Sequence, residues 1–227
     1  MIHLILAAGL ALAPIRARGE SLYELRCSSC HGLVLQGGPD APPLIGKSAA
    51  DVDFMLQTGR MPAAAPGQQY VDVKPQLSQP DILAIVSYVS SRGHGPVQLP
   101  RLASGNAAHG RAIFAENCQQ CHGVSAHGAS VGYANIAPSL MHTRPEQIAE
   151  AVRVGPGEMP QFGPDVMTDA NLDDLVSFVG FLQHEKRSYN PGGLQLANVG
   201  PVAEGFVAWV FGLGALVLFV RAIGSKD

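Results

Sequence analysis

Charged residues are scarce in this chain of 227 residues: Asp, Glu, Lys and Arg make up 15% of it, against 47% apolar residues. This composition, with a positive mean hydropathy, is too apolar for a disordered chain or a purely soluble domain, so it indicates a membrane segment. The formal net charge is −3 and no basic run is present. Nucleic-acid binding therefore lacks the basic patch that it needs.

Cysteine is also scarce. All four cysteines fall in two copies of one motif, Cys27-Ser-Ser-Cys30-His31 and Cys118-Gln-Gln-Cys121-His122. C-x-x-C-H is the spacing of covalent haem attachment. Two thiols three residues apart can add to the two vinyl groups of one porphyrin, and the adjacent imidazole can then bind the iron. The motifs predict two covalently attached haems c with His31 and His122 as proximal ligands, outside the cytoplasm, where such attachment occurs.

Two other readings of the CxxC pairs fit less well. A Cys₄ zinc site usually brings its second pair within about 15–20 residues and needs no histidine after each pair. A thioredoxin-like pair is expected within a βαβ pattern, and the sequence shows none.

The motifs lie within an internal repeat whose features follow in the same order in both copies. A glycine, an aromatic residue and the first cysteine recur every four residues and share one helix face. Each motif is followed by a Gly/Pro-rich loop, an amphipathic helix ending in glycine, a Met-Pro pair and a closing helix. The matched residues are Gly19, Tyr23, Cys27 and Gly110, Phe114, Cys118; Pro42-Pro43-Leu44 and Pro138-Ser139-Leu140; helices over 50–56 and 145–152; Gly59 and Gly155; Met61-Pro62 and Met159-Pro160; and helices over 78–91 and 168–183.

The repeat predicts how the chain is divided. We expect an apolar N-terminal segment, a first domain, a linker, a second domain, a tether, a transmembrane helix and a cytoplasmic tail. Their ranges are 1–15, 16–92, 93–105, 106–187, 188–200, 201–220 and 221–227.

Methionine is the predicted sixth ligand of each iron. Met61 and Met159 occupy matching places, each followed by proline, and His/Met ligation raises the reduction potential and closes the iron to small ligands. The unmatched Met55, Met141 and Met167 are expected in the cores. His127 and His142 are the competing ligands in the second domain, but neither has a counterpart in the first; with His94, His109 and His184 they are assigned to loops or the surface.

A ligand histidine needs an acceptor for its second ring nitrogen. The carbonyl of Pro42 or Pro138 is the predicted acceptor, because a proline-containing loop presents a rigid backbone oxygen. A plain turn at these prolines is the alternative.

Both ends of the chain are apolar. Residues 201–220 carry only Glu204 as a charge, and twenty helical residues extend about 30 Å, the thickness of a bilayer core. Arg221 and Lys226 follow, so the positive-inside tendency leaves the C-terminus in the cytoplasm and both motifs outside. Residues 1–13 are too short for a comfortable span; a membrane anchor is preferred there to a cleaved signal peptide.

Taken together, these residues resemble the dihaem cytochrome c subunit of the actinobacterial-type menaquinol–cytochrome c reductase, the cytochrome bcc complex. The resemblance runs from about Gly19 to the C-terminus, and CxxCH alone would indicate only a cytochrome c. Its more specific segments are Thr58-Gly59-Arg60-Met61-Pro62-Ala63-Ala64-Ala65-Pro66-Gly67, Gly155-Pro156-Gly157-Glu158-Met159-Pro160-Gln161-Phe162-Gly163-Pro164 and Asn190-Pro191-Gly192-Gly193-Leu194 leading into Gly200 to Trp209.

The resemblance implies an all-α chain with two tandem class I cytochrome c domains and a C-terminal transmembrane helix. It also implies cytochrome b and Rieske iron–sulfur subunits as partners and association with an aa₃-type oxidase in the plasma membrane. The expected function is electron transfer as a subunit of the reductase. The alternatives are the dihaem subunit of a cbb₃-type oxidase, which usually carries its anchor before the haem domains, and a catalytic dihaem peroxidase or sulfur oxidase. That last class would need an open iron or a spare cysteine.

Overall fold

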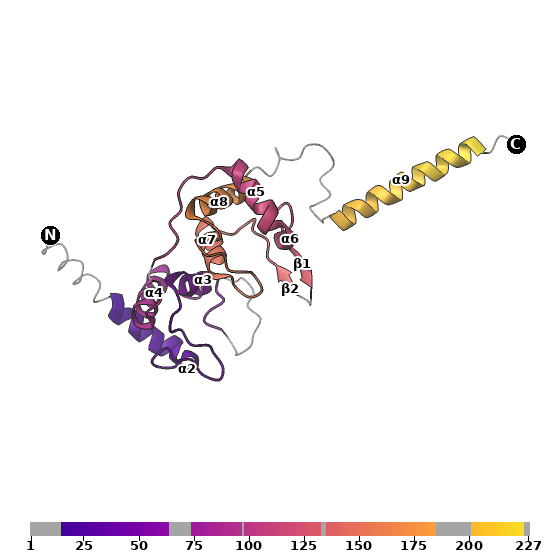
Figure 1. The fold of residues 1–227 in the computed structure, drawn as a ribbon. Coiled ribbons are helices and arrows are strands. Elements are labelled where there is room, and N and C mark those ends of the chain that lie inside the picture. The colour runs from indigo at the N-terminus through magenta and orange to yellow at the C-terminus, as the bar shows by residue number, and fades with distance from the viewer. Residues whose placement is uncertain (1–14, 64–73, 97, 133–134, 185–200, 225–227) are drawn as a thin grey trace. The chain divides into compact units, whose positions relative to one another are not determined.

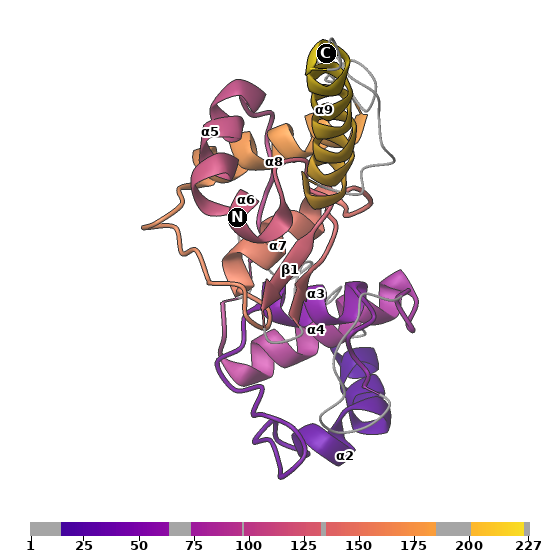
Figure 2. The same cartoon turned by 90° about the vertical axis from the view of Figure 1, so that its right-hand side faces the viewer.

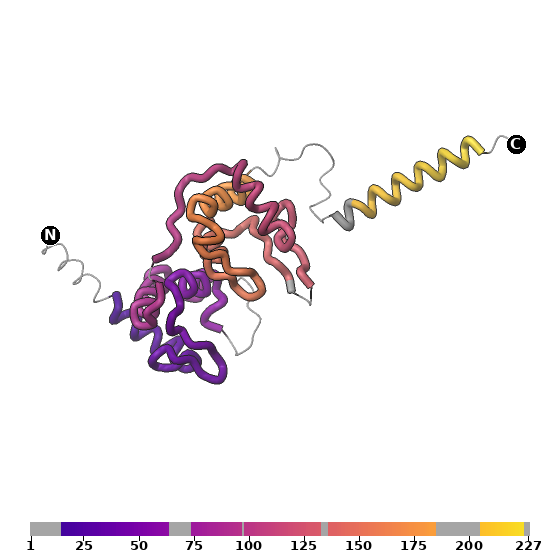
Figure 3. The backbone as a smooth tube through the Cα atoms, in the orientation of Figure 1, coloured from indigo at the N-terminus to yellow at the C-terminus, as the bar shows by residue number. Residues whose placement is uncertain are grey.

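The structure is a computed structural model that describes residues 15–63, 74–96, 98–132, 135–184 and 201–224. The chain divides into two compact units, Met1–Gln183 and His184–Asp227. The first unit contains both predicted domains (Figure 1). Figure 3 traces the backbone through them in sequence order, from indigo to orange.

The first domain is built from helices around one core. Residues 15–26 are helical, followed by α2 (Ser28–His31), α3 (Ala49–Gln57) and α4 (Gln79–Gly93). Ser48 caps α3 through a reciprocal pair of hydrogen bonds with Asp51, which satisfies amide groups at the helix start. The buried core residues are Tyr23, Leu35, Ala49, Leu56, Ile82, Ile85, Val86, Tyr88 and Val89.

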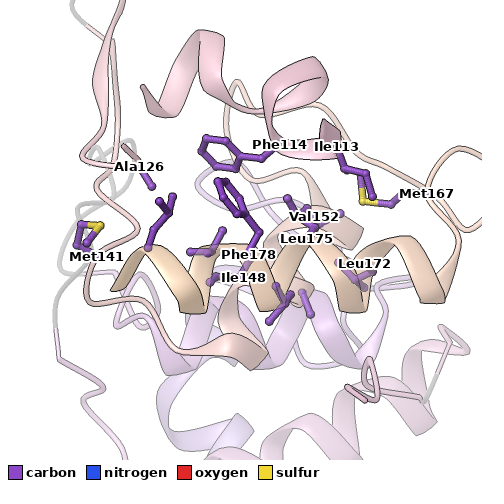
Figure 4. Packing of buried hydrophobic residues seen from close by; sticks show 14 residues of the cluster. Ile113, Phe114, Ala126, Met141, Ile148, Val152, Met167, Leu172, Leu175 and Phe178 are labelled. Atoms are coloured by element: carbon purple, nitrogen blue, oxygen red, sulfur yellow. The ribbon is translucent and has the colours of Figure 1, made fainter. Parts of the chain in front are cut away.

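The second domain repeats this plan with α5 (Ala107–Asn117), α6 (Gln119–His122), α7 (Pro145–Val154) and α8 (Asp169–His184). Figure 4 shows its core, where Phe114 and Phe178 meet with ring centroids 5.5 Å apart. The matching pair in the first domain, Tyr23 and Tyr88, has the same centroid distance of 5.5 Å. The repeat in the sequence is therefore a repeat in packing.

A helix crossing at glycine holds each domain together. A Cβ atom on Gly19 would overlap the backbone carbonyl of Ala84 in α4, and one on Gly110 would overlap that of Asp174 in α8. Only glycine allows backbones to approach this closely. The first and last helices of each domain therefore cross in contact, one turn before the aromatic pair.

The second domain also contains a two-stranded antiparallel sheet of β1 (Ala129–Gly132) and β2 (Asn135–Ala137). An all-α chain is thus the correct class in outline, but the loop between α6 and α7 forms a hairpin. β2 is followed directly by Pro138. The hairpin therefore belongs to the loop that brings the Pro138 carbonyl next to His122.

The linker predicted at 93–105 forms hydrogen bonds and apolar contacts with both domains. The Ala49 amide donates to the Pro96 carbonyl at 2.7 Å, and the Gly105 amide donates to Ser177 Oγ at 3.0 Å. Leu99 packs on the first core and Leu102 on the second.

The second unit contains α9 (Pro201–Gly224), of which Gly205–Gly224 is long and apolar enough to cross a membrane. The large apolar side chains in that segment are exposed, as a lipid-facing helix requires. The helix extends past the predicted end at residue 220. Residues 1–14 of the N-terminal segment, the whole tether predicted at 188–200 and residues 225–227 lie outside the described residues.

Candidate haem sites

Each motif histidine ends a four-residue helix and is held by a carbonyl from the following loop. His31 and His122 are both 8% exposed. Nδ1 of His31 lies 2.9 Å from the Pro42 carbonyl oxygen, and Nδ1 of His122 lies 2.9 Å from that of Pro138. A carbonyl can only accept, so Nδ1 carries the proton and Nε2 keeps its lone pair for a metal.

The loop that presents each proline folds in the same way in both domains. The histidine carbonyl accepts an amide proton at 2.8 Å from Gly37 in one domain and from Gly128 in the other. The amides of Leu44 and Leu140 donate to Leu35 and Ala126, two fully buried residues with positive φ, again at 2.8 Å. The proline carbonyls are thus fixed by the loop backbone.

No disulfide joins the four cysteines, so all of their sulfur atoms remain available for attachment. Cys27 and Cys118 are half-buried, whereas Cys30 and Cys121 are exposed. Burial is the main cause that raises the pKa of the Cys27 and Cys118 thiols, in each case to about 11, so both stay protonated at neutral pH.

The two candidate methionines lie on the loops that follow α3 and α7. Both side chains are half-buried, and each packs on the core of its own domain, Met61 beside the cluster that Cys27 also borders and Met159 beside the one that Cys118 borders. Met141 and Met167, expected in the core, are indeed buried there.

The competing histidines of the second domain are exposed. His127 bonds within its own turn, with Nδ1 2.9 Å from the Ser125 carbonyl. Across the described ranges, no three His, Cys, Asp or Glu side chains gather as a metal site.

The surroundings of the motifs fit a porphyrin, a large apolar ring. Apolar side chains that are more than half exposed follow each histidine or flank its proline carbonyl: Leu33, Val34 and Ile45 in the first domain, Val124 and Ile136 in the second. Apolar side chains at these positions could cover the faces of an apolar ring bound at the histidine. Each domain thus offers a buried histidine with Nε2 available for iron, a pair of cysteines, and a methionine on the same core. These residues could hold haem c.

Two helical domains, each with a CxxCH motif whose histidine is locked to a loop carbonyl, define a c-type cytochrome. A family model described as Cytochrome c matches residues 16–93, and one described as Cytochrome C oxidase, cbb3-type, subunit III matches residues 105–179. Over 92% of its length the chain is 32% identical to a cytochrome bc1 complex cytochrome c subunit of Mycobacterium leprae, of which it covers 74%. The chain belongs to the family of cytochrome bc1 complex cytochrome c subunits.

Two further relatives show how specific this assignment is. The cytochrome bc1 complex cytochrome c subunit of Corynebacterium efficiens is 30% identical over 93% of this chain and 77% of the relative. The cbb3-type cytochrome c oxidase subunit FixP of Bradyrhizobium sp. (strain ORS 278) is 31% identical, but over 57% of this chain and 47% of the relative. The resemblance to the bc1 subunits therefore extends over nearly the whole chain.

Sequence reasoning missed the polar contact between α3 and α7. Asp53 on α3 and Glu150 on α7 are 5% and 3% exposed, at positions flanked by apolar neighbours. Carboxyl groups on the buried face of a helix are rare unless partnered, and this signal could have drawn attention to both residues.

Proposed function

We propose that this chain relays electrons from a Rieske iron–sulfur protein, through two covalently bound haems c, to an aa₃-type oxidase. The duplicated histidine–carbonyl contact is the observation that carries the proposal, because it prepares one ligand nitrogen in each domain. The bound group supplies a one-electron redox centre; the protein binds it, fixes its ligands and sets its potential.

The proposed ligands are His31 and Met61 in the first domain and His122 and Met159 in the second, with thioether bonds from Cys27, Cys30, Cys118 and Cys121. Both methionines border the core of the domain whose histidine they would face across a porphyrin. Two protein ligands leave no position for a substrate, which suits transfer of electrons and not chemical conversion.

The proposed partners are the cytochrome b and Rieske subunits of a menaquinol–cytochrome c reductase, and membrane lipid. The names of the bacterial relatives support membership of such a complex. We place α9 in the plasma membrane with Arg221 at its cytoplasmic end and both haem domains on the extracytoplasmic side.

The second candidate is a subunit of a cbb3-type oxidase, favoured by the family model over residues 105–179. The described spanning helix follows the haem domains, and the match to FixP covers a smaller part of the chain, so the reductase is preferred.

Gene replacement in the native membrane tests the function. Membranes lacking this chain should lose quinol-driven reduction of the oxidase, and the full chain should restore it. A His31→Ala, His122→Ala double variant should be inserted but fail to restore it. Retention of the quinol-driven reduction without the chain would contradict the proposal.

A further inference from the structure

The contact between α3 and α7 joins the two haem domains of the chain (Figure 2). Gln57, 5% exposed, is at its centre. Its Oε1 accepts a hydrogen bond from Arg144 Nη2 at 3.0 Å, and its backbone carbonyl accepts one from Gln147 Nε2 at 3.3 Å. Its Nε2 donates to Gln79 Oε1 of α4 at 2.9 Å.

Asp53 on α3 and Glu150 on α7 belong to the two helices of the same contact, one from each domain, and both are buried. Glu150 Oε2 is buried and has no hydrogen-bond partner among the described residues. Two ionised carboxyl groups buried in one contact would repel each other, so burial of the pair favours one bound proton, which we assign to Glu150.

The charged groups around Glu150 favour this state. Burial is the largest cause that raises its pKa, to about 9, followed by the charge and hydrogen bond of Asp53. Glu146 on the same helix adds to the rise, whereas Arg144 opposes it. Gln57 and Gln147, which are hydrogen-bonded across the same contact, are neutral.

We propose that α3 and α7 form a docking interface that fixes the two haem domains against each other, closed by one proton held between Glu150 and Asp53. Removing that proton leaves two buried negative charges side by side, and the domains separate to hydrate them. The docking does not depend on the proposed function; only its consequence, a constant separation between two electron-transfer centres, rests on it.

The difference in the Glu150 pKa between docked and separated domains gives the direction in which pH shifts the docking equilibrium. In the separated state Glu150 is exposed and takes its ordinary pKa of about 4.5, whereas docking raises it to about 9. The docked form therefore binds one more proton between these values. The ratio of docked to separated molecules falls by up to about tenfold for each pH unit in that window and is constant above it.

A distance measurement between the domains tests the proposal. Spin labels on Leu83→Cys in α4 and Ala170→Cys in α8, both exposed positions, report the separation by pulsed electron resonance in the full detergent-solubilised chain. We expect one narrow distance at about pH 6 and a second, longer distance at about pH 10. The same distance distribution at both values would overturn the proposal.

Matched variants identify the proton. Glu150→Gln mimics the protonated side chain and should give the narrow distance at both pH values. Glu146→Gln removes the same charge from an exposed site on the same helix; because Glu146 is the smallest of the causes that raise the Glu150 pKa, this variant should still show the longer distance at about pH 10. Asp53→Asn, on the opposite helix, should lower the upper limit of the pH window. A pH response of Glu150→Gln equal to that of the parent would refute the role of this carboxyl.

Discussion

His31 donates its Nδ1 proton to the Pro42 carbonyl across 2.9 Å, and the equivalent bond recurs between His122 and Pro138. The acceptor is a backbone oxygen, fixed by the fold of its loop. Each histidine therefore presents one orientation and one tautomer, and the identity of the sixth ligand becomes the open chemical question.

Replacing either matched methionine should remove half of one spectroscopic signal. If both irons have His/Met ligands, the oxidised chain shows the weak long-wavelength sulfur-to-iron absorption band. Met61→His or Met159→His should each reduce its intensity by about half, because each removes one of two thioethers. Met55→Leu, at a half-buried position on α3, should leave the band unchanged. A full band in either ligand variant would contradict the assignment.

The glycine crossings should tolerate no side chain. Gly19→Ala brings a Cβ onto the Ala84 carbonyl of α4, and overpacking of this kind costs about 1–3 kcal/mol of unfolding free energy. Gly180→Ala is the control, since a Cβ there meets no atom within 4 Å. That change should stabilise α8 by up to about 1 kcal/mol. Denaturant unfolding measures the free energy of unfolding of both variants. Equal changes in the two would contradict the close crossing at Gly19.

The Tyr23 hydroxyl should contribute to the stability of the first domain. Tyr23 is fully buried and donates to the Gly32 carbonyl at 2.6 Å, and burial raises its pKa to about 12, so the donor stays neutral. Tyr23→Phe removes the bond and should cost about 1–2 kcal/mol in denaturant unfolding. Ser21→Ala, which removes an exposed hydroxyl bond within the same helix, should change it by less than about 0.5 kcal/mol. Equal losses of unfolding free energy in the two variants would show that the buried Tyr23 bond stabilises the domain no more than the exposed Ser21 bond.

Global stability should depend on pH through Glu150. Its folded pKa of about 9 lies above the ordinary 4.5, so the folded chain binds more protons than the unfolded chain between these values. The contribution of Glu150 to the unfolding free energy therefore falls as pH rises through this window, by at most about 1.4 kcal/mol per unit. The difference between the parent and Glu150→Gln, measured by denaturant unfolding at several pH values, should follow this slope; a constant difference would contradict it.

The repeated features could be predicted from the sequence because they depend on local spacing. Gly19, Tyr23 and Cys27 are one helical turn apart, which predicts that they share one helix face. That Gly19 meets Ala84 and Tyr23 meets Tyr88 was shown by the structure and not predicted. The β1–β2 hairpin was not predicted, because its strands of four and three residues carry no sustained alternation.

The contact between the domains could not be predicted in the same way. Asp53 and Glu150 are 97 positions apart and come together only when α3 packs on α7, a consequence of tertiary structure. Their neighbours in sequence show that the positions are buried, but nothing local shows that they face each other.

Purification of the tagged full chain from native membranes in mild detergent, with identification of the chains that remain bound, tests the account most directly. The account predicts cytochrome b and Rieske iron–sulfur subunits in amounts equal to this chain, accompanied by an aa₃-type oxidase. Recovery of the intact haem-bearing chain with neither a cytochrome b nor a Rieske subunit would contradict it.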